Sequence, residues 1–308
     1  MNKGPNHIIV ASWVAILGNA LLAFLKLIIG FISGSFAVIA DGIDSATDIV
    51  SSIVSLVAAR IVARPPNIKF SYGYSKADTL ATKVLSMMIF IAGAQLAITT
   101  IQRLLSAEVS SLPSMIAIYV TVFSMLGKIA LSIYLRTVGK KQKSNMMITM
   151  GKHMRSDMLI SSTVLIGLIV AMTLTLPIID KVIALLISVF IMYEAIRIFM
   201  RTNLELMDGI DNPYLYEKLF DSIKNVDGAH NPHRTRARKI GSHYMINLDI
   251  EVDPHLTVLE AHDIAKKVED SIKENIENVY DVMVHVEPQG NLEKDEKFGV
   301  SEKDVTKK

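Results

Sequence analysis

Two apolar stretches of the chain each carry ionisable side chains at helical spacing. Asp44 and Asp48 stand four residues apart in one stretch, and His153 and Asp157 stand four residues apart in the other. Residues at i and i+4 share one face of a helix, so each stretch would present two ligand-type side chains to a neighbour. Facing helices of this kind can hold a divalent ion in four-coordinate geometry. The spacing therefore indicates a metal site between two helices.

The same stretches contain charges whose purpose is less obvious. A carboxylate in hydrocarbon costs about 2.5 to 3.5 kcal/mol on insertion scales, so each one calls for a function or a partner. Asp41 precedes Asp44 in "FAVIADGIDSATDIVSS". A hydrogen bond between helices would explain Asp41 by itself, and its role stays open. We interpret Lys26 and Lys128 as single pairing or snorkelling residues.

The elements that position these residues are long apolar runs. Hydrophobic residues make up 51% of the 308 residues, whereas about 45 to 50% apolar residues, with Gly included, is usual for soluble domains. Crossing a bilayer takes about 20 mostly apolar residues. We therefore expect a membrane all-α domain of six transmembrane helices over residues 1–206, and no cleaved signal peptide. The runs lie near 8–30, 35–62, 80–105, 112–138, 145–174 and 178–200.

The connections between the runs indicate an orientation. "RIVARPPNIKFSYGYSK" and "RTVGKKQKS" are rich in Arg and Lys, whereas "SGS", "SAEVSSLP" and "LTLP" are not. By the positive-inside rule the basic loops, and with them both termini, face the cytoplasm.

The last third of the chain has the mixed polar and apolar composition of a soluble domain. Its pattern predicts a helix, two strands, an amphipathic helix and a third strand over residues 207–290. We expect a small cytoplasmic α+β domain of ferredoxin-like (metallochaperone-like) αββαβ type. The charged tail 291–308 has too little apolar content to order itself, so we expect it to be disordered.

The chain resembles the cation diffusion facilitator family over nearly its whole length. The resemblance rests on the order and spacing of "DSATD", "FSYGYSKAD", "HMRSD", "LMD", "LEAHDIAKKVEDSI" and "VMVHVEP". It implies a homodimeric exporter in a bacterial cell (inner) membrane that moves divalent transition metal out of the cytoplasm by alternating access, in exchange for protons. It also implies that the transport site consists of Asp44, Asp48, His153 and Asp157.

The ligand set narrows the choice of metal. Three carboxylates and one imidazole, in a chain with no cysteine, argue against Cu(I) and permit Zn, Fe(II), Mn(II), Co(II) and Cd. We expect zinc first, with iron or manganese next. Carboxylate and imidazole must lose their protons to bind metal, so exchange of metal for protons suits these ligands.

The resemblance implies a second metal site in the cytoplasmic domain, at the dimer interface. We interpret His233, His243 and His255 as surface residues. The positions that match the family's ligands are His230, Asp249, His262, His285 and Glu287.

The resemblance also concerns residues near the membrane surface. Lys76 matches a lysine that pairs with an acid after the sixth span, here Asp208, and such a pair could act as a hinge. Some relatives carry a further metal site in the loop before the third span. This chain has Asn67, Phe70 and Tyr74 in that loop, so we expect the site to be absent.

Two other classes of function remain open on the residues alone. An intramembrane aspartyl protease would also place two acids in neighbouring spans, but it has no use for the His153 and Asp157 pair. A metal sensor or a metal channel without proton coupling would use the same ligands. We expect no enzymatic activity, no catalytic residues and no nucleic-acid partner, because the basic "RTRARK" strand suits a solvated face near anionic lipid.

Overall fold

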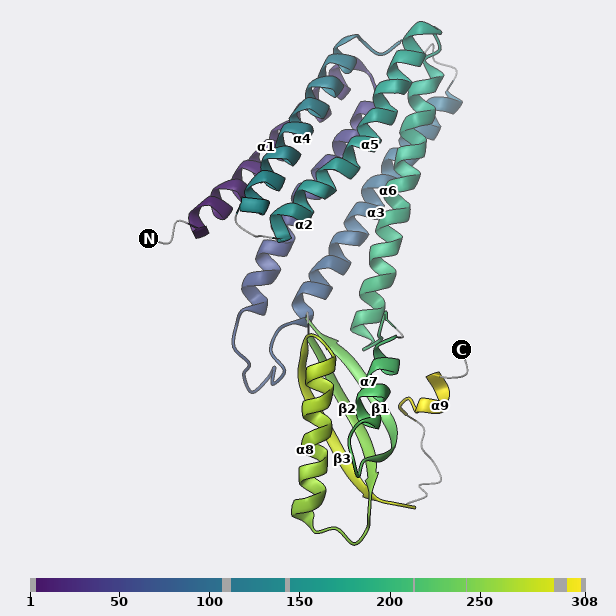
Figure 1. Ribbon diagram of the computed structural model, residues 1–308. Helices are drawn as coiled ribbons and strands as arrows, with labels where there is room; N and C mark the ends of the chain where they lie inside the picture. The colour runs from purple at the N-terminus through teal and green to yellow at the C-terminus, as the bar shows by residue number, and fades with distance from the viewer. Residues whose placement is uncertain are drawn as a thin grey trace. The chain divides into compact units, whose positions relative to one another are not determined.

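The computed structural model describes residues 4–106, 112–141, 145–212, 214–241, 243–290 and 298–305. These residues form six long helices followed by a small α+β domain, which confirms the predicted architecture (Figure 1). Two compact units divide the chain, Met1–Arg60 with Ala81–Phe199 and Ile61–Leu80 with Met200–Lys308. The long helices are α1 Gly4–Ser33, α2 Phe36–Val62, α3 Lys76–Leu105, α4 Ile116–Lys141, α5 Asn145–Thr173 and α6 Ile178–Leu206.

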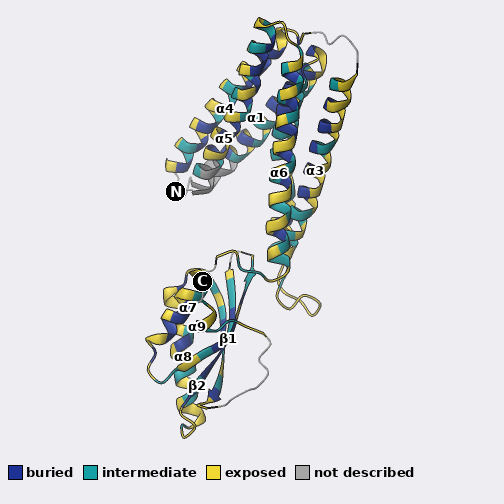
Figure 2. Cartoon of the chain, turned by 90° about the vertical axis from the view of Figure 1, so that its right-hand side faces the viewer, coloured by how far each residue is buried: buried dark blue, intermediate teal, exposed yellow. Residues whose placement is uncertain are grey.

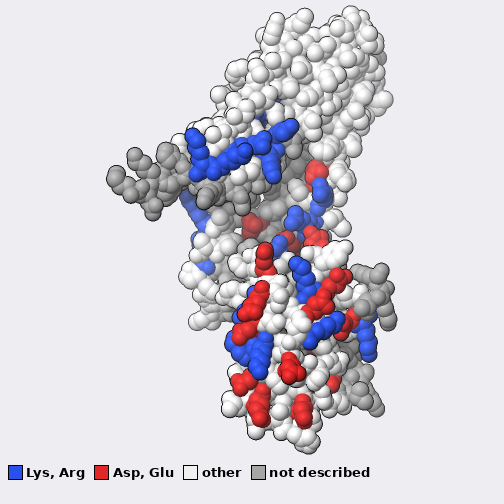
Figure 3. Space-filling model, in the orientation of Figure 1, with Lys and Arg blue, Asp and Glu red and all other residues white. Residues whose placement is uncertain are grey.

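The outer surface of the long helices is suited to lipid. All six are long and apolar enough to cross a membrane. Large apolar side chains face outward, with Phe31 82% exposed and Leu186 62% exposed. In Figure 3 the upper part of the spans in view is free of charged side chains, and Lys and Arg gather towards the lower ends of the helices. An apolar surface of this extent is stable against lipid tails and not against water, so the chain is a multi-pass membrane protein.

Small residues allow the first two spans to pack closely. A Cβ added at Gly30 of α1 would lie 2.9 Å from Cγ1 of Ile39, and one at Gly42 of α2 would lie 2.9 Å from Cδ2 of Leu27. Close backbone approach of this kind is how helices gain packing energy within lipid. The buried core between the spans includes Val38, Leu96, Val164, Leu168 and Ile191.

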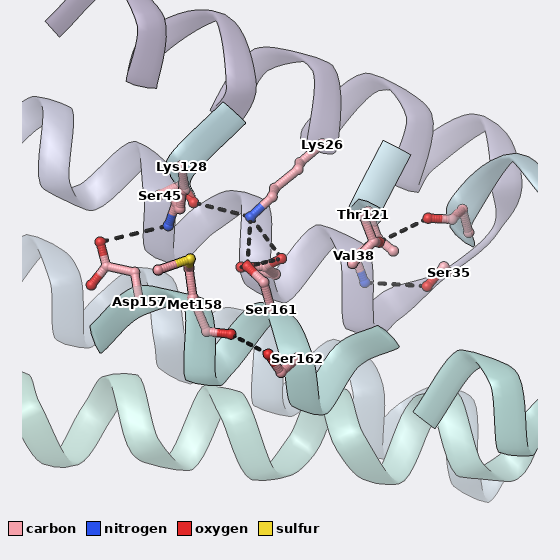
Figure 4. A network of polar contacts seen from close by, with 12 residues as sticks. Lys26, Ser35, Val38, Ser45, Thr121, Lys128, Asp157, Met158, Ser161 and Ser162 are labelled. Atoms are coloured by element: carbon pink, nitrogen blue, oxygen red, sulfur yellow. Dashed lines mark hydrogen bonds and ion pairs between the residues drawn. The ribbon is translucent and has the colours of Figure 1, made fainter. Parts of the chain in front are cut away.

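A buried ion pair joins three spans (Figure 4). Nζ of Lys26 on α1 lies 2.7 Å from Oδ2 of Asp41 on α2, and both side chains are fully buried. Ser161 on α5 accepts a hydrogen bond from Lys26 at 3.0 Å and donates to the Asp41 carboxylate at 2.9 Å. Lys26 also donates to Oγ of Ser45 at 3.5 Å. Asp41 therefore serves as the counter-ion of Lys26, and Lys26 does not snorkel.

An acid on α6 caps the start of α2. Asp180 accepts one hydrogen bond from the Ser35 hydroxyl at 2.6 Å and another from the Phe36 backbone N–H at 2.7 Å. The Ser35 hydroxyl accepts from the Val38 N–H at 3.2 Å. The first N–H groups of a helix have no partner within the helix, and lipid offers none. Asp180 therefore fixes the beginning of α2 beside α6.

The C-terminal α+β domain is a three-stranded sheet with its helices on one face (Figure 2). The strand order is β1-β2-β3, with β1 antiparallel to β2 and β2 parallel to β3. Its core includes Leu219, Leu248, Ile250, Val268 and Ile272. In chain order the elements are α7 Tyr214–Lys224, β1 His230–Ile240, β2 His243–Val252, α8 Val258–Asn275 and β3 Val279–Pro288, followed by the short α9 Glu302–Val305.

Part of the charged tail has an ordered place, which differs from the expectation of disorder. Val300 pairs with Thr235 on β1 through backbone hydrogen bonds of 2.9 and 3.1 Å. Val300 and Val305 also pack against the domain core. Two valines in the described part of the tail thus supply apolar contacts, which the low apolar content of the whole tail does not predict. Residues 291–297 and 306–308 lie outside the described residues.

Thr257 caps the N-terminus of α8 with a reciprocal pair of side-chain hydrogen bonds. The Thr257 hydroxyl accepts from the Glu260 N–H at 3.3 Å, and the Glu260 carboxylate accepts from the Thr257 N–H at 2.8 Å. The Thr257 side chain and backbone donate hydrogen bonds that hold the pKa of Glu260 below its usual range. A lowered acid pKa means that the ionised form stabilises the folded helix.

The capping pair makes the first turn of α8 sensitive to acid. We expect hydrogen-exchange protection factors in this turn to be constant near neutrality and to fall as the pH drops below 4.5, the ordinary glutamate value, through the lowered pKa of Glu260. Thr257→Ala should lower the protection about fivefold at neutral pH and weaken the pH dependence. Exchange of β2 amides serves as the internal control, and an unchanged pH profile in the variant would count against the cap.

The ion pair of Lys26 and Asp41 makes a prediction about stability. Lys26→Met leaves a buried carboxylate without its partner, which costs about 3–5 kcal/mol. We expect a lower unfolding temperature for this variant in detergent. Lys26→Met/Asp41→Asn removes both charges and should recover most of the loss. Equal losses in the single and the double variant would show that the pair is not what the fold depends on.

Candidate metal centre

Three of the expected ligands come together between α2 and α5. Candidate ligand atoms of Asp48, His153 and Asp157 all lie within 4.8 Å of one another. Nδ1 of His153 lies 3.2 Å from Oδ1 of Asp157, as the i, i+4 spacing on α5 implies. These side chains could hold one metal ion.

One carboxylate oxygen of this group is left without a hydrogen bond. Among the described residues, Oδ2 of Asp48 is buried and has no hydrogen-bond partner. A buried carboxylate oxygen without a partner is costly, because hydration is lost and nothing replaces it. A cation bound beside Asp48 would supply the missing interaction. The donor set of carboxylates and imidazole suits a divalent transition metal.

Asp44 lies close to this group but is not part of it. It stands one turn before Asp48 on α2 and is partly buried, outside the set of atoms within 4.8 Å. The next residue, Ser45, is fully buried and contacts Lys26. A role for Asp44 as the fourth ligand stays a prediction.

Lys128 on α4 adds a positive charge to the site. Its side chain is fully buried, and Nζ lies 3.6 Å from Oδ2 of Asp157 (Figure 4). The Asp157 carboxylate therefore lies between Lys128 and His153. Sequence reasoning interpreted Lys128 as a single pairing or snorkelling residue and named no partner for it, because nothing in the sequence shows which face of α4 meets α5. A lone lysine in an apolar span was the available signal.

A second group of candidate ligands lies on the sheet of the C-terminal domain. His233, Asp249 and Glu287 are buried, and their ligand atoms lie within 4.8 Å of one another. Nε2 of His233 is 3.4 Å from Oε2 of Glu287. Nε2 of His285 is 3.7 Å from Oε1 of the same acid. Arg234 also reaches the group, with Nη1 3.0 Å from Oδ2 of Asp249.

This group corrects the expected assignment of two histidines. His233, expected on the surface, is buried in the group, whereas His230 is exposed and pairs with Glu251 across the sheet. The register of β1 against β2 is irregular on both sides of His233. Continued from the pair of Arg236 and Asn247, a regular ladder would place Arg234 opposite Asp249. The irregularity, which is typical of a β-bulge, places His233 there instead.

The remaining expected residues have mixed outcomes. His262 is exposed on α8 and is not in the group, whereas Asp249, His285 and Glu287 are brought together. Nζ of Lys76 lies 2.7 Å from Oδ1 of Asp208, and each side chain is 44% exposed. The pair joins the start of α3 to the segment after α6.

The loop before α3 has its own internal contacts. The side-chain amide of Asn67 donates to the Tyr74 hydroxyl at 2.6 Å, and the rings of Phe70 and Tyr74 lie 4.7 Å apart. Arg238 of β1 stacks on Tyr72 of this loop, with 4.5 Å between the guanidinium carbon and the ring centroid.

Two protein-family models match the chain. Residues 12–207 match a cation efflux transmembrane domain, and residues 212–289 match the cytoplasmic domain of cation efflux proteins. Together they cover the six spans and the α+β domain.

Several known proteins are similar to the chain. The uncharacterised transporter YdbO of Bacillus subtilis is 32% identical over 89% of this chain and 93% of its own length. The manganese efflux system protein MneS of the same species is 31% identical over 89% and 93%, respectively. Among solved structures, the metal-bound C-terminal domain of the CzcD transporter from Thermotoga maritima is 38% identical to the matched part of the chain. The match covers 26% of this chain and 92% of the CzcD domain, with a TM-score of 0.25.

The matched transmembrane model spans well over half of the chain, and the similarity to YdbO and MneS extends over nearly all of it. The chain therefore belongs to the cation diffusion facilitator family of metal efflux transporters.

Proposed function

We propose that this transporter exports divalent transition-metal cations from the cytoplasm in exchange for protons, by alternating access. Asp44, Asp48, His153 and Asp157 would bind the cargo between α2 and α5. The observation that carries this proposal is the close grouping of Asp48, His153 and Asp157 around a buried carboxylate oxygen that lacks a hydrogen bond. A cation fits this arrangement better than any neutral substrate, since every side chain in it is an acceptor when deprotonated.

We rank manganese(II) first among the cargoes and zinc(II) second. Carboxylate oxygens are the ligands that suit Mn(II), and three of the four proposed ligands are carboxylates. The similarity to MneS, which is named as a manganese efflux protein, supports the same order. The sequence-based expectation placed zinc first, from a ligand set that permits several divalent metals.

Proton exchange follows from the chemistry of the same ligands. A metal ion can bind only when carboxylates and imidazole are deprotonated, so protons arriving at the site compete with the metal. A site opened alternately to each side would then release metal where protons are abundant and bind it where they are scarce.

The setting of the transporter is proposed from loop charge and family. The match of residues 212–289 to a cytoplasmic domain supports cytoplasmic placement of both termini, in agreement with the basic loops. We propose a homodimer in a bacterial inner membrane, and a cytoplasmic metal site at His233, Asp249, His285 and Glu287.

Transport assays test the main proposal. Purified protein in proteoliposomes should accumulate Mn²⁺ in the direction opposite to the protons, which flow down an imposed proton gradient, and collapse of the gradient should stop accumulation. Asp48→Ala should abolish this flux, because the open buried acceptor is removed. Asp211→Ala, which removes an exposed acid outside the spans, is the matched control.

The same assay separates the alternatives. Mn²⁺ flux that follows the metal gradient and ignores the pH gradient would contradict exchange and favour a channel. Metal binding without any flux would favour a sensor. Parallel runs with Zn²⁺ rank the two metals by their saturating rates and half-saturating concentrations.

Calorimetric titration tests the cytoplasmic site. The full chain carrying Asp48→Ala should retain Mn²⁺ binding at the sheet, so further substitutions report on that site alone. His233→Ala in this background should weaken binding about tenfold or more, because a buried ligand is lost. His230→Ala should have little effect, since His230 is exposed and outside the group. The opposite pattern would restore the sequence-based assignment.

A further inference from the structure

Lys128 is a buried lysine with unusually few partners. Its side chain is fully buried on α4, and its ion pair with Asp157 spans 3.6 Å. Among the described residues, its Nζ has no hydrogen-bond acceptor. An ammonium group carries three donors, so leaving them unused inside the spans is costly.

The other buried lysine of the spans shows what a structural pair looks like here. Lys26 lies 2.7 Å from Asp41 and donates to Ser161 and Ser45 at 3.0 and 3.5 Å. Its charge is cancelled by one acid, and its donors have oxygen partners. Lys128, by contrast, has no hydrogen-bond partner among the described residues, and its longer ion pair is with an acid that His153 also contacts. These differences separate it from a residue that only holds helices together.

The net charge of the proposed metal site follows from the charged side chains around it. Asp44, Asp48 and Asp157 supply three negative charges when they are ligands, and His153 is neutral as a ligand. Lys26 and Asp41 cancel each other. Lys128 lies against Asp157, and its charge also acts on Asp44 and Asp48. With Lys128 the total is therefore −2, and without it the total would be −3.

We propose that Lys128 is the fixed counter-charge of the transport site, which sets its net charge so that one divalent cation makes it neutral. This inference rests on the proposed function of the site as the place where cargo binds. Lys128 is not a ligand, because an ammonium group has no lone pair to offer a metal. It acts through the field that it exerts on the ligands and on the cargo.

The location of Lys128 within the spans makes its charge effective. Charges interact more strongly in a low-dielectric interior than in water, and the attraction between a metal ion and an uncompensated carboxylate would be hard to reverse there. A positive charge beside the ligands weakens binding to the point where the cargo can leave. Lys128 thus favours turnover over retention, and it favours divalent over monovalent cations by charge balance.

Calorimetric titration of the detergent-solubilised full chain with Mn²⁺ tests the inference, with the heat that remains in Asp48→Ala subtracted. Lys128→Met keeps the length of the side chain and removes its charge. We expect it to bind Mn²⁺ at least about tenfold more tightly and to transport it more slowly at saturation. Lys128→Arg, which restores the charge, should return the affinity towards the wild-type value. Unchanged or weaker binding by Lys128→Met would overturn the counter-charge role, as would tighter binding by both variants alike.

A second pair of variants covers the case in which Lys128→Met does not fold. Asp157→Asn/Lys128→Met leaves neither the acid nor the lysine of that ion pair, and Asp157→Asn alone keeps the lysine. The double variant should bind Mn²⁺ at least about fivefold more tightly than the single one, and equal affinities would overturn the inference.

The wild type separates this inference from the function on which it rests. Mn²⁺ binding that is lost in Asp48→Ala supports the transport site whatever Lys128 does, so a failure confined to the Lys128 variants overturns the counter-charge alone. Wild-type protein with no binding beyond that of Asp48→Ala would overturn both.

Discussion

Charge compensation inside the membrane is the constraint on which this structure depends. The spans offer no water to solvate an ion, so each buried charge must have a partner within the protein. Lys26 and Asp41 satisfy this requirement with a contact of 2.7 Å, completed by Ser161. Because Lys26, Asp41 and Ser161 belong to α1, α2 and α5, respectively, these contacts also fix which faces of the three helices meet.

The position of the candidate metal site depends on that ion pair. Ser45 directly follows Asp44, and Ser161 lies one turn after Asp157 on α5. Both serines contact Lys26, so the same network that neutralises Lys26 places the proposed ligands of α2 and α5 opposite each other. Fully compensated charges thus hold the framework, whereas Oδ2 of Asp48 and Nζ of Lys128 have no hydrogen-bond partner among the described residues.

The C-terminal domain has a similar arrangement of charges in a different fold. Its candidate ligands Asp249 and Glu287 also lie beside a fixed cation, Arg234, at 3.0 and 3.9 Å. There the ligands come from a sheet, and a register irregularity in β1 brings His233 to the acids. Both clusters therefore combine at least two carboxylates, at least one histidine and one positive side chain.

The sequence by itself determined the six spans, the αββαβ order of the C-terminal domain and the two i, i+4 pairs, Asp44 with Asp48 and His153 with Asp157, because hydrophobic runs and i, i+4 spacing are local properties. Tertiary structure alone decided the rest. Whether Lys26 meets Asp41, and Lys128 meets Asp157, depends on how helices far apart in the chain face each other. That His233 lies opposite Asp249, in place of the expected His230, depends on an irregular strand pairing that leaves no local signal in the sequence.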